Sequence, residues 1–340
     1  MKAVVVPRPL PASEKDCFVD ADLPDPQPGP HDLIVAVEAV SVNPVDCKQR
    51  MVKARVEGTP RVLGYDAAGT VRAIGSAVSL FKPGDRVYYA GDVGRSGSNA
   101  QLHAVDERIV GRMPATLDFA AAAALPLTAI TAWEGLFDRL KVSAPPDVRQ
   151  RKSILVVGGA GGVGSMVIQL AAKVAGLEVI ATATRPESSQ WCRDLGADHV
   201  VSHAGDLAAA VRATGRRFVD YVFLTNDADR HFAAAAQVLA PLGGIVSIIR
   251  TNAPLDVSAL MGKSCSVSWE FMFTRPSNAT PDMIEQHHLL NQVAQLVDRG
   301  VIRATQTTVL TPINAANLRT AHMQVEAGRS IGKAVLHGWG

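Results

Sequence analysis

Short apolar runs alternate with amphipathic stretches between residues 153 and 273. The runs are ILVV (154–157), EVIAT (178–182), HVV (199–201), VDYVFL (219–224), IVSII (245–249) and SVSWEFMF (266–273). Strands that are apolar on both faces are typical of a parallel sheet covered by helices on both sides. The pattern therefore predicts a doubly wound α/β domain, in which Gly176, Gly196 and Gly243 would cap the ends of intervening helices.

The first part of the chain follows a different pattern. LIVAVEAVSV, GTVRAIG and KPGDRVYYAG read as short strands separated by glycine turns, which predicts a compact and mostly antiparallel barrel. The last part contains one clear helix, MIEQHHLLNQVAQLVDRG, and two strand-like segments, TQTTVL and KAVLHGW. We expect this tail to return to the first domain. The predicted domains are residues 1–125, residues 126–275, and the returning residues 276–340.

Composition narrows the class of protein. A chain of 340 residues exceeds what one hydrophobic core usually organises, so two domains fit its length. The net charge is only +2, and the 34 basic and 32 acidic residues are interspersed, which argues against a nucleic-acid partner. The longest apolar stretch, residues 119–133, is rich in alanine and interrupted by Pro126, so it predicts buried helices and no membrane span.

Cysteine usage and the first residues bear on the compartment. The four cysteines lie far apart without a C-x-x-C pair, which argues against a disulfide framework and against a cysteine-rich zinc lobe. The apolar run at the start is broken by Pro7 and is too short for the core of a signal peptide. We therefore expect a cytoplasmic protein.

The strongest local motif is SILVVGGAGGVGSMVIQLAAKVAG, residues 153–176. Gly159, Gly161 and Gly164 form G-x-G-x-x-G directly after a predicted strand and before a predicted helix, which is the context of a dinucleotide-binding turn. The free N–H groups of that helix would face a pyrophosphate. A glycine turn used only for packing is the alternative. The predicted cofactor-binding residues here are Gly159, Ala160, Gly161, Gly162, Val163 and Gly164.

The end of the second strand predicts which dinucleotide binds. A protein that binds NAD places a carboxylate there for the ribose 2′-hydroxyl, whereas this chain reads VIATATRPE. Thr184 and Arg185 occupy the region, and a guanidinium suits the 2′-phosphate of NADP. Glu187 follows Pro186 and is expected to open the next helix. We therefore predict NADPH as the cofactor, and Arg185 as a merely solvated residue is the alternative.

Several stretches together resemble one enzyme superfamily. They are VSVNPVDCKQR, GTPRVLGYDAAGTVRAIG, KPGDRVYYAG, AAALPLTAITAWEGL, WCRDLGADHV, WEFMFTR and GKAVLHG, which span nearly the whole chain. The sequence is similar to the medium-chain dehydrogenase/reductase superfamily, and most of all to its zinc-independent quinone oxidoreductase branch, in the group called zinc-type alcohol dehydrogenase-like. The resemblance implies a GroES-like β-barrel catalytic domain, a Rossmann domain, NADPH in the cleft between them, and usually a homodimer.

The residues at the zinc positions depart from the zinc-dependent relatives. Those relatives have a cysteine where this chain has Asn43, and glycine-histidine-glutamate where it has Gly64, Tyr65 and Asp66. An amide and a neutral phenol are poor ligands for tetrahedral zinc, and no cysteine lies between Cys47 and Cys192 to build a structural zinc lobe. We therefore expect no metal.

Reduction of a quinone or an enone can proceed without a metal. An alkoxide is the base of an acid with a pKa of roughly 16, so alcohol dehydrogenases use zinc as a Lewis acid. Hydride transfer to a quinone instead produces a phenolate, which resembles tyrosine with a pKa of about 10 and can be stabilised by hydrogen-bond donors. The preferred function is NADPH-dependent reduction of a quinone. Reduction of an alkenal or enone double bond, a non-catalytic NADPH-binding protein and a zinc alcohol dehydrogenase remain alternatives.

The resemblance adds candidate residues outside the glycine turn. Asn43 and Tyr65 would be catalytic: the amide would reach the nicotinamide end, and the phenol would donate to the developing oxyanion. Thr128 and Lys333 match family positions near the cofactor. A turn residue, an aromatic lining residue and a core residue are the alternatives for Asn43, Tyr65 and Thr128. The apolar last strand, residues 266–273, predicts a homodimer paired through this edge.

Overall fold

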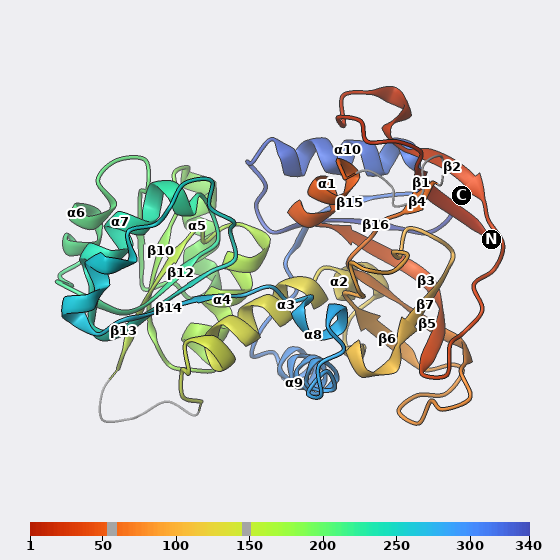
Figure 1. The fold of residues 1–340 in the computed structure, drawn as a ribbon, viewed down its shortest axis with the longest axis horizontal. Coiled ribbons are helices and arrows are strands. Elements are labelled where there is room, and N and C mark those ends of the chain that lie inside the picture. The colour runs from red at the N-terminus through yellow and green to blue at the C-terminus, as the bar shows by residue number, and fades with distance from the viewer. Residues whose placement is uncertain (53–59, 145–150) are drawn as a thin grey trace. The chain divides into compact units, whose positions relative to one another are not determined.

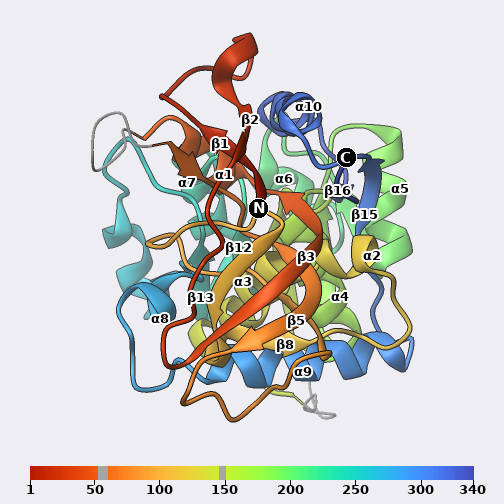
Figure 2. The same cartoon turned by 90° about the vertical axis from the view of Figure 1, so that its right-hand side faces the viewer.

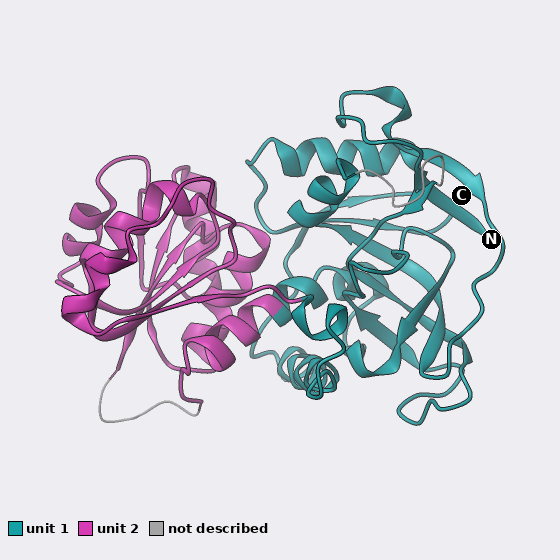
Figure 3. Ribbon diagram, viewed as in Figure 1, with its two compact units in different colours: residues 1–130, 273–340 teal, residues 131–272 magenta. Residues whose placement is uncertain are grey.

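The computed structural model describes residues 1–52, 60–144 and 151–340 of the chain. The chain divides into two compact units, residues 1–130 with 273–340 (unit 1) and residues 131–272 (unit 2) (Figure 3). The tail thus returns to the first unit. The divisions fall a few residues from the predicted ones, because the helix α3 (Pro126–Trp133) carries the chain from one unit to the other.

Unit 1 is built on a seven-stranded sheet in the order β15-β16-β3-β5-β6-β8, and β7 also pairs with β3. All these pairs are antiparallel except β15 with β16. A second sheet has the order β2-β1-β4. Figures 1 and 2 show the helices α9 and α10 at opposite ends of this unit.

The strands of unit 1 are β1 (Lys2–Val6), β2 (Val19–Asp22), β3 (Asp32–Val42), β4 (Arg61–Val62), β5 (Ala67–Ile74), β6 (Arg86–Tyr89), β7 (Leu102–Asp106), β8 (Val110–Arg112), β15 (Gln306–Leu310) and β16 (Lys333–His337). Its helices besides α3 are α1 (Pro44–Arg50), α2 (Phe119–Ala123), α8 (Thr274–Ser277), α9 (Glu285–Asp298) and α10 (Ala315–Glu326), with short 3-10 turns η1 (Lys15–Cys17) and η2 (Glu107–Ile109).

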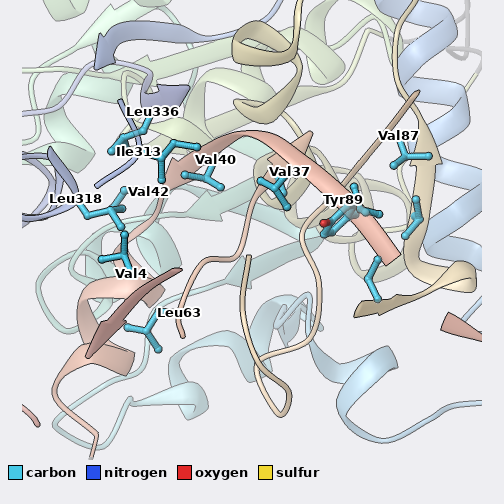
Figure 4. Packing of buried hydrophobic residues seen from close by; sticks show 14 of the residues in the cluster. Val4, Val37, Val40, Val42, Leu63, Val87, Tyr89, Ile313, Leu318 and Leu336 are labelled. Atoms are coloured by element: carbon cyan, nitrogen blue, oxygen red, sulfur yellow. The ribbon is translucent and has the colours of Figure 1, made fainter. Parts of the chain in front are cut away.

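The core of unit 1 joins segments from both ends of the chain. Val37, Val40 and Val42 from β3 pack with Leu336 of β16 and Leu318 of α10 (Figure 4). Because β3 is 11 residues long and pairs with β5, β7 and β16, it forms the centre of the barrel. The C-terminal end of β3 therefore lies between β16 and β5.

Unit 2 is a six-stranded, wholly parallel sheet in the order β11-β10-β9-β12-β13-β14. Leu155 and Val157 of β9 belong to the core shared with α6 and α7, and their neighbours Ile154 and Val156 are fully buried as well. The helix α4 contacts β9 and β10, so the sheet carries helices on both faces (Figure 1). The order reverses between β9 and β12, which makes the carboxyl ends of these strands the expected ligand edge.

The elements of unit 2 are β9 (Ser153–Val157), α4 (Gly162–Lys173), β10 (Glu178–Thr182), α5 (Pro186–Leu195), β11 (His199–Val201), α6 (Leu207–Arg212), β12 (Val219–Leu224), α7 (Ala228–Val238), β13 (Leu239–Ser247) and β14 (Ser266–Trp269). A π-helical turn η3 (Glu134–Arg139) and a 3-10 segment η4 (Val257–Lys263) complete it.

Two details of the predicted parallel-sheet domain are wrong, one helix cap and the end of the last strand. Gly196 caps α5 as expected, but Gly243 lies inside β13, where a Cβ atom would come within 2.7 Å of the Asp220 carbonyl oxygen. The last strand ends at Trp269 and does not continue to Phe273. Phe273 belongs to unit 1 and is buried against the ring of Tyr65, so the aromatic residues of this stretch do not share one strand face.

No helix in the described part of the chain combines the length and the apolar character that a membrane span requires.

Candidate functional site

The glycine turn joins the end of β9 to the start of α4. Gly158 has a φ of +82°, and its N–H donates to the hydroxyl of Thr182 at the end of β10, 2.9 Å away. A Cβ atom on Gly159 would come within 2.9 Å of the Ala181 side chain, and one on Gly164 within 2.3 Å of the Gly158 carbonyl oxygen. Packing therefore explains why these positions are glycine.

Packing does not explain why position 161 is a glycine. A Cβ atom there would meet only the Gly158 carbonyl oxygen, at an ordinary distance of 3.6 Å. Gly161 precedes the first turn of α4, whose N–H groups have no carbonyl partner within the helix. A backbone that stays open in front of a helix N-terminus fits the close approach of a pyrophosphate. The other predicted residues of the turn are placed beside it: Ala160 is buried, and Gly162 and Val163 are half-buried.

The predicted 2′-phosphate residues follow β10 directly. Thr184 is exposed, and Arg185 is the residue that precedes the first turn of α5, with its N–H 3.2 Å from the Ser188 hydroxyl. The guanidinium of Arg185 lies 3.4 Å from a carboxylate oxygen of Glu187, whose side chain is 57% exposed. Exposed ion pairs contribute only about 0–1 kcal/mol, so a phosphate can compete with Glu187 for this cation.

The catalytic candidate Asn43 belongs to a buried network in unit 1. Its side-chain amide donates to Asp66 Oδ2 at 2.8 Å and to the Tyr65 carbonyl oxygen at 3.2 Å. The ammonium of Lys333 donates to three acceptors: Asn43 Oδ1, Asp66 Oδ2 at 3.0 Å and the Val42 carbonyl oxygen at 3.1 Å. Asp66 and Lys333 are 0% and 4% exposed, so this is an ion pair inside the protein.

Strand register explains how the network assembles. Val42 of β3 pairs with Ala334 of β16, which puts Lys333 beside the residue that follows β3. On the other side the N–H of Ser41 donates to the carbonyl oxygen of Asp66, directly before β5. Neighbouring antiparallel strands thus bring the three side chains to one edge of the sheet.

Two carboxyl groups near this edge were not among the predicted site residues. Asp66 Oδ1 accepts the N–H of Leu127 at 2.7 Å, and burial raises the pKa of Asp66 while Lys333 opposes that rise. Asp46, in the first turn of α1, accepts the N–H of Asn43 at 2.8 Å, and burial raises its pKa to about 7. The sequence signalled Asp66 only through its place at a zinc position of the relatives, and Asp46 only as a charged residue next to an apolar strand.

Tyr65 differs from its neighbours in its hydrogen bonding. Its ring is 2% exposed and packs edge-on against Phe273 at a centroid distance of 5.4 Å. No described residue exchanges a hydrogen bond with its hydroxyl in this structure. Burial, and then the charge of Asp46, raise the pKa of Tyr65. The phenol therefore stays protonated and keeps a hydrogen available to donate.

Thr128 lies in α3 within unit 1, and its hydroxyl donates to the Leu125 carbonyl oxygen at 3.0 Å. The candidates thus form two groups. Asn43, Tyr65 and Lys333 are brought together in unit 1, and the glycine turn, Thr184 and Arg185 are brought together in unit 2. In the described ranges, no three His, Cys, Asp or Glu side chains cluster in a way that could hold a metal ion.

Comparison with known proteins identifies the family. Residues 29–115 match the family described as alcohol dehydrogenase GroES-like domain, and residues 195–336 match zinc-binding dehydrogenase. A zinc-type alcohol dehydrogenase-like protein of Staphylococcus aureus is 42% identical over 337 residues, covering 99% of this chain and 100% of that protein. The chain belongs to the medium-chain dehydrogenase/reductase superfamily. Within this superfamily the predicted GroES-like barrel and Rossmann-type parallel sheet are confirmed.

Other members of the superfamily add detail. The structure of a candidate zinc-dependent alcohol dehydrogenase from Rhizobium etli is 50% identical, with a TM-score of 0.96 over 100% of this chain and 98% of that one. A quinone oxidoreductase from Coxiella burnetii shares the fold, with a TM-score of 0.82, 24% identity and coverage of 100% and 99%. An NADPH-dependent alkenal/one oxidoreductase of Arabidopsis thaliana is 42% identical over 181 residues, which is 50% of this chain and 45% of that protein.

Proposed function

We propose that this protein is an NADPH-dependent oxidoreductase that reduces quinones by hydride transfer and needs no zinc. The observation that supports this most is the buried pair of Lys333 and Asp66. Asn43 and Asp66, which stand where zinc-dependent relatives carry ligands, are bound to an ammonium group, so their polar atoms already have a cation as partner.

The nucleotide would be held by unit 2. The open backbone at Gly161 and the N-terminus of α4 suit the pyrophosphate, and Arg185 suits a 2′-phosphate. When bound, NADPH supplies the hydride from its nicotinamide ring. The Arabidopsis relative, whose name states NADPH dependence, supports the same choice of cofactor.

We assign to Tyr65 the role of hydrogen-bond donor to the substrate oxygen that becomes negatively charged during reduction. Hydride addition to a quinone leaves a phenolate oxygen, whose conjugate acid has a pKa of about 10. A protonated phenol that makes no hydrogen bond to the described residues can donate to that oxygen, and solvent supplies the proton that completes the hydroquinone. Asn43 is then a positioning residue. Its amide donates a hydrogen bond to the Tyr65 carbonyl oxygen and so fixes the backbone that carries the phenol.

Reduction of an activated carbon–carbon double bond is the second candidate. The Arabidopsis alkenal/one oxidoreductase favours it. Hydride addition to an enone leaves an enolate, which also needs a hydrogen-bond donor and no Lewis acid. The same assignment of Tyr65 therefore serves both substrates.

The test measures NADPH oxidation with quinones, alkenals and alcohols, together with the zinc content of the purified protein. We expect turnover with quinones, little zinc, and activity that survives a chelator. Tyr65→Phe should lower kcat with a quinone by about tenfold to a hundredfold, because one hydrogen bond to an oxyanion is lost. The matched control Tyr221→Phe alters a buried tyrosine of β12 in unit 2 and should keep wild-type kcat.

Three results would contradict the proposal. Near one zinc per chain, with activity lost on chelation and alcohols as the best substrates, would identify a zinc alcohol dehydrogenase. Tight NADPH binding without turnover of any tested acceptor would identify a cofactor-binding protein. Turnover of alkenals alone would select the second candidate.

A further inference from the structure

A histidine lies beside the predicted 2′-phosphate site. β10 and β11 run parallel with Thr182 opposite Val201, and the N–H of Ala183 donates to the Val201 carbonyl oxygen at 3.0 Å. The segments that lead to Arg185 and to His203 therefore leave the sheet next to each other, at the carboxyl edge where nucleotides bind in such folds.

One hydroxyl connects His203 to the glycine turn. Nδ1 of His203 lies 2.7 Å from Thr182 Oγ1, and the same oxygen accepts the N–H of Gly158 at 2.9 Å. Because Thr182 Oγ1 accepts from Gly158, we place its hydroxyl as the donor and Nδ1 of His203 as the acceptor. A neutral His203 therefore carries its proton on Nε2, which leaves that nitrogen as a hydrogen-bond donor.

The surroundings of His203 favour an anion. The guanidinium of Arg230, on α7, donates to the Ala204 carbonyl oxygen at 2.7 Å, and the ring of His231 lies 5.5 Å from that of His203. Burial, and then the charge of Arg230, lower the pKa of His203.

The acidic side chains of the neighbouring elements already have partners. Asp227 accepts the N–H of Arg230 at the start of α7, Asp206 accepts the N–H of Ala209 in α6, and Glu187 pairs with Arg185. Asp227 and Asp206 keep their negative charges, but among the charged groups it is that of Arg230 that shifts the pKa of His203.

We propose that His203 acts with Arg185 to recognise the 2′-phosphate, and that protonation of His203 makes the preference for NADPH over NADH increase as the pH falls. This inference rests on the proposed use of NADPH. A phosphate favours the charged imidazolium, so binding raises the pKa of His203 and takes up a proton. Affinity for the 2′-phosphate should therefore rise as the pH falls from about 8 to about 6, until the phosphate itself is protonated near pH 6.

Calorimetric titration with 2′,5′-ADP and 5′-AMP tests the proposal without turnover, because the two probes differ only in the 2′-phosphate. For the wild type we expect the ratio of the two affinities to grow about threefold to tenfold between about pH 8 and about pH 6. Titration in two buffers with different ionisation enthalpies should also detect uptake of a proton with 2′,5′-ADP. His203→Gln keeps a neutral donor, so the ratio should lose this pH dependence and the extra proton uptake should vanish.

His199→Gln is the matched control. His199 starts β11 at the opposite edge of the sheet, where its ring nitrogen lies 3.5 Å from Glu178 and its side chain is 40% exposed. This variant should behave as the wild type. Unchanged binding of 5′-AMP by His203→Gln would show that the variant is folded.

The outcomes separate the two proposals. If wild type and His203→Gln both prefer 2′,5′-ADP and keep the same pH dependence, the role of His203 is wrong and NADPH use stands. The role of His203 is also wrong if the wild-type preference for 2′,5′-ADP does not change with pH. If the wild type binds both probes equally at both pH values, the choice of NADPH fails, and the role of His203 fails with it.

Discussion

Lys333→Met tests whether the buried ammonium holds the edge of unit 1 together. Methionine keeps most of the length and apolar volume of the side chain but removes the charge and all three donated hydrogen bonds. Asp66 would retain the N–H of Leu127 and the amide of Asn43, and it would lose the only ammonium group that the described residues place against it. The carboxylate would then be buried without a counter-charge.

The expected cost is large and depends on pH. Removing one partner of a buried ion pair typically costs about 3–5 kcal/mol, because the remaining charge is left uncompensated. Burial already raises the pKa of Asp66 above its ordinary value of 3.8, and loss of Lys333 would raise it further. A carboxyl group with a raised folded pKa is most favourable to folding below its unfolded pKa, and this contribution is lost as the pH rises through the folded pKa. The variant's deficit should therefore shrink on acidification and grow towards alkaline pH.

Urea unfolding of the wild type, Lys333→Met, Asp66→Asn and the double variant measures this cost. The double variant removes both charges, so its loss of stability should be clearly smaller than the sum of the two single losses. Lys82→Met, which changes an exposed lysine of the same unit, should stay within about 0.5 kcal/mol of the wild type. A loss below about 1 kcal/mol for Lys333→Met, or additive losses in the double variant, would refute the structural role of the pair.

Two further predictions concern unit 2. Arg185→Glu should raise the KM for NADPH about tenfold to a hundredfold with a smaller change in kcat, because a charge-assisted hydrogen bond is worth roughly 1.5–3 kcal/mol; steady-state kinetics with both cofactors would disprove this if the variant kept its preference for NADPH. The edge strand β14 leaves Trp269 and the following Phe271 54% and 53% exposed, so we expect a homodimer paired at this edge and expect Trp269→Glu to weaken it. Light scattering that finds the wild type monomeric at micromolar concentration would contradict the dimer.

The parallel sheet could be predicted from the sequence because its signals are local. Each strand contains a short apolar run, and the glycine turn follows the first of them directly. The errors arose where a residue has two structural uses. Gly243 resembles a helix cap but serves a strand that leaves no room for a side chain, and the apolar run after Trp269 resembles a longer strand but supplies Phe273 to the core of unit 1.

The ion pair of unit 1 could not be predicted in the same way. Lys333 and Asn43 are separated by 290 positions, and only the pairing of β16 with β3 brings them together. The resemblance pointed to Asn43, Tyr65 and Lys333 one at a time, the first two as catalytic residues and Lys333 as a residue near the cofactor. It did not indicate that Lys333 neutralises Asp66, because that partnership depends on strand register and on the burial of both side chains.

The hydrogen bonds of Lys333 limit what this site can reduce. An ammonium group has three hydrogens, and here they are donated to Asn43, Asp66 and the Val42 carbonyl oxygen. Lys333 therefore has no hydrogen left for a substrate, and in the proposed function it offsets the charge of Asp66 without acting as an acid. Tyr65, whose pKa is raised by burial, is a weak acid and can stabilise an oxyanion only by donating a hydrogen bond. Such a site is suited to substrates whose reduced form spreads its charge, as phenolates and enolates do, and it is poorly suited to a saturated ketone, whose alkoxide is more basic by roughly six pKa units.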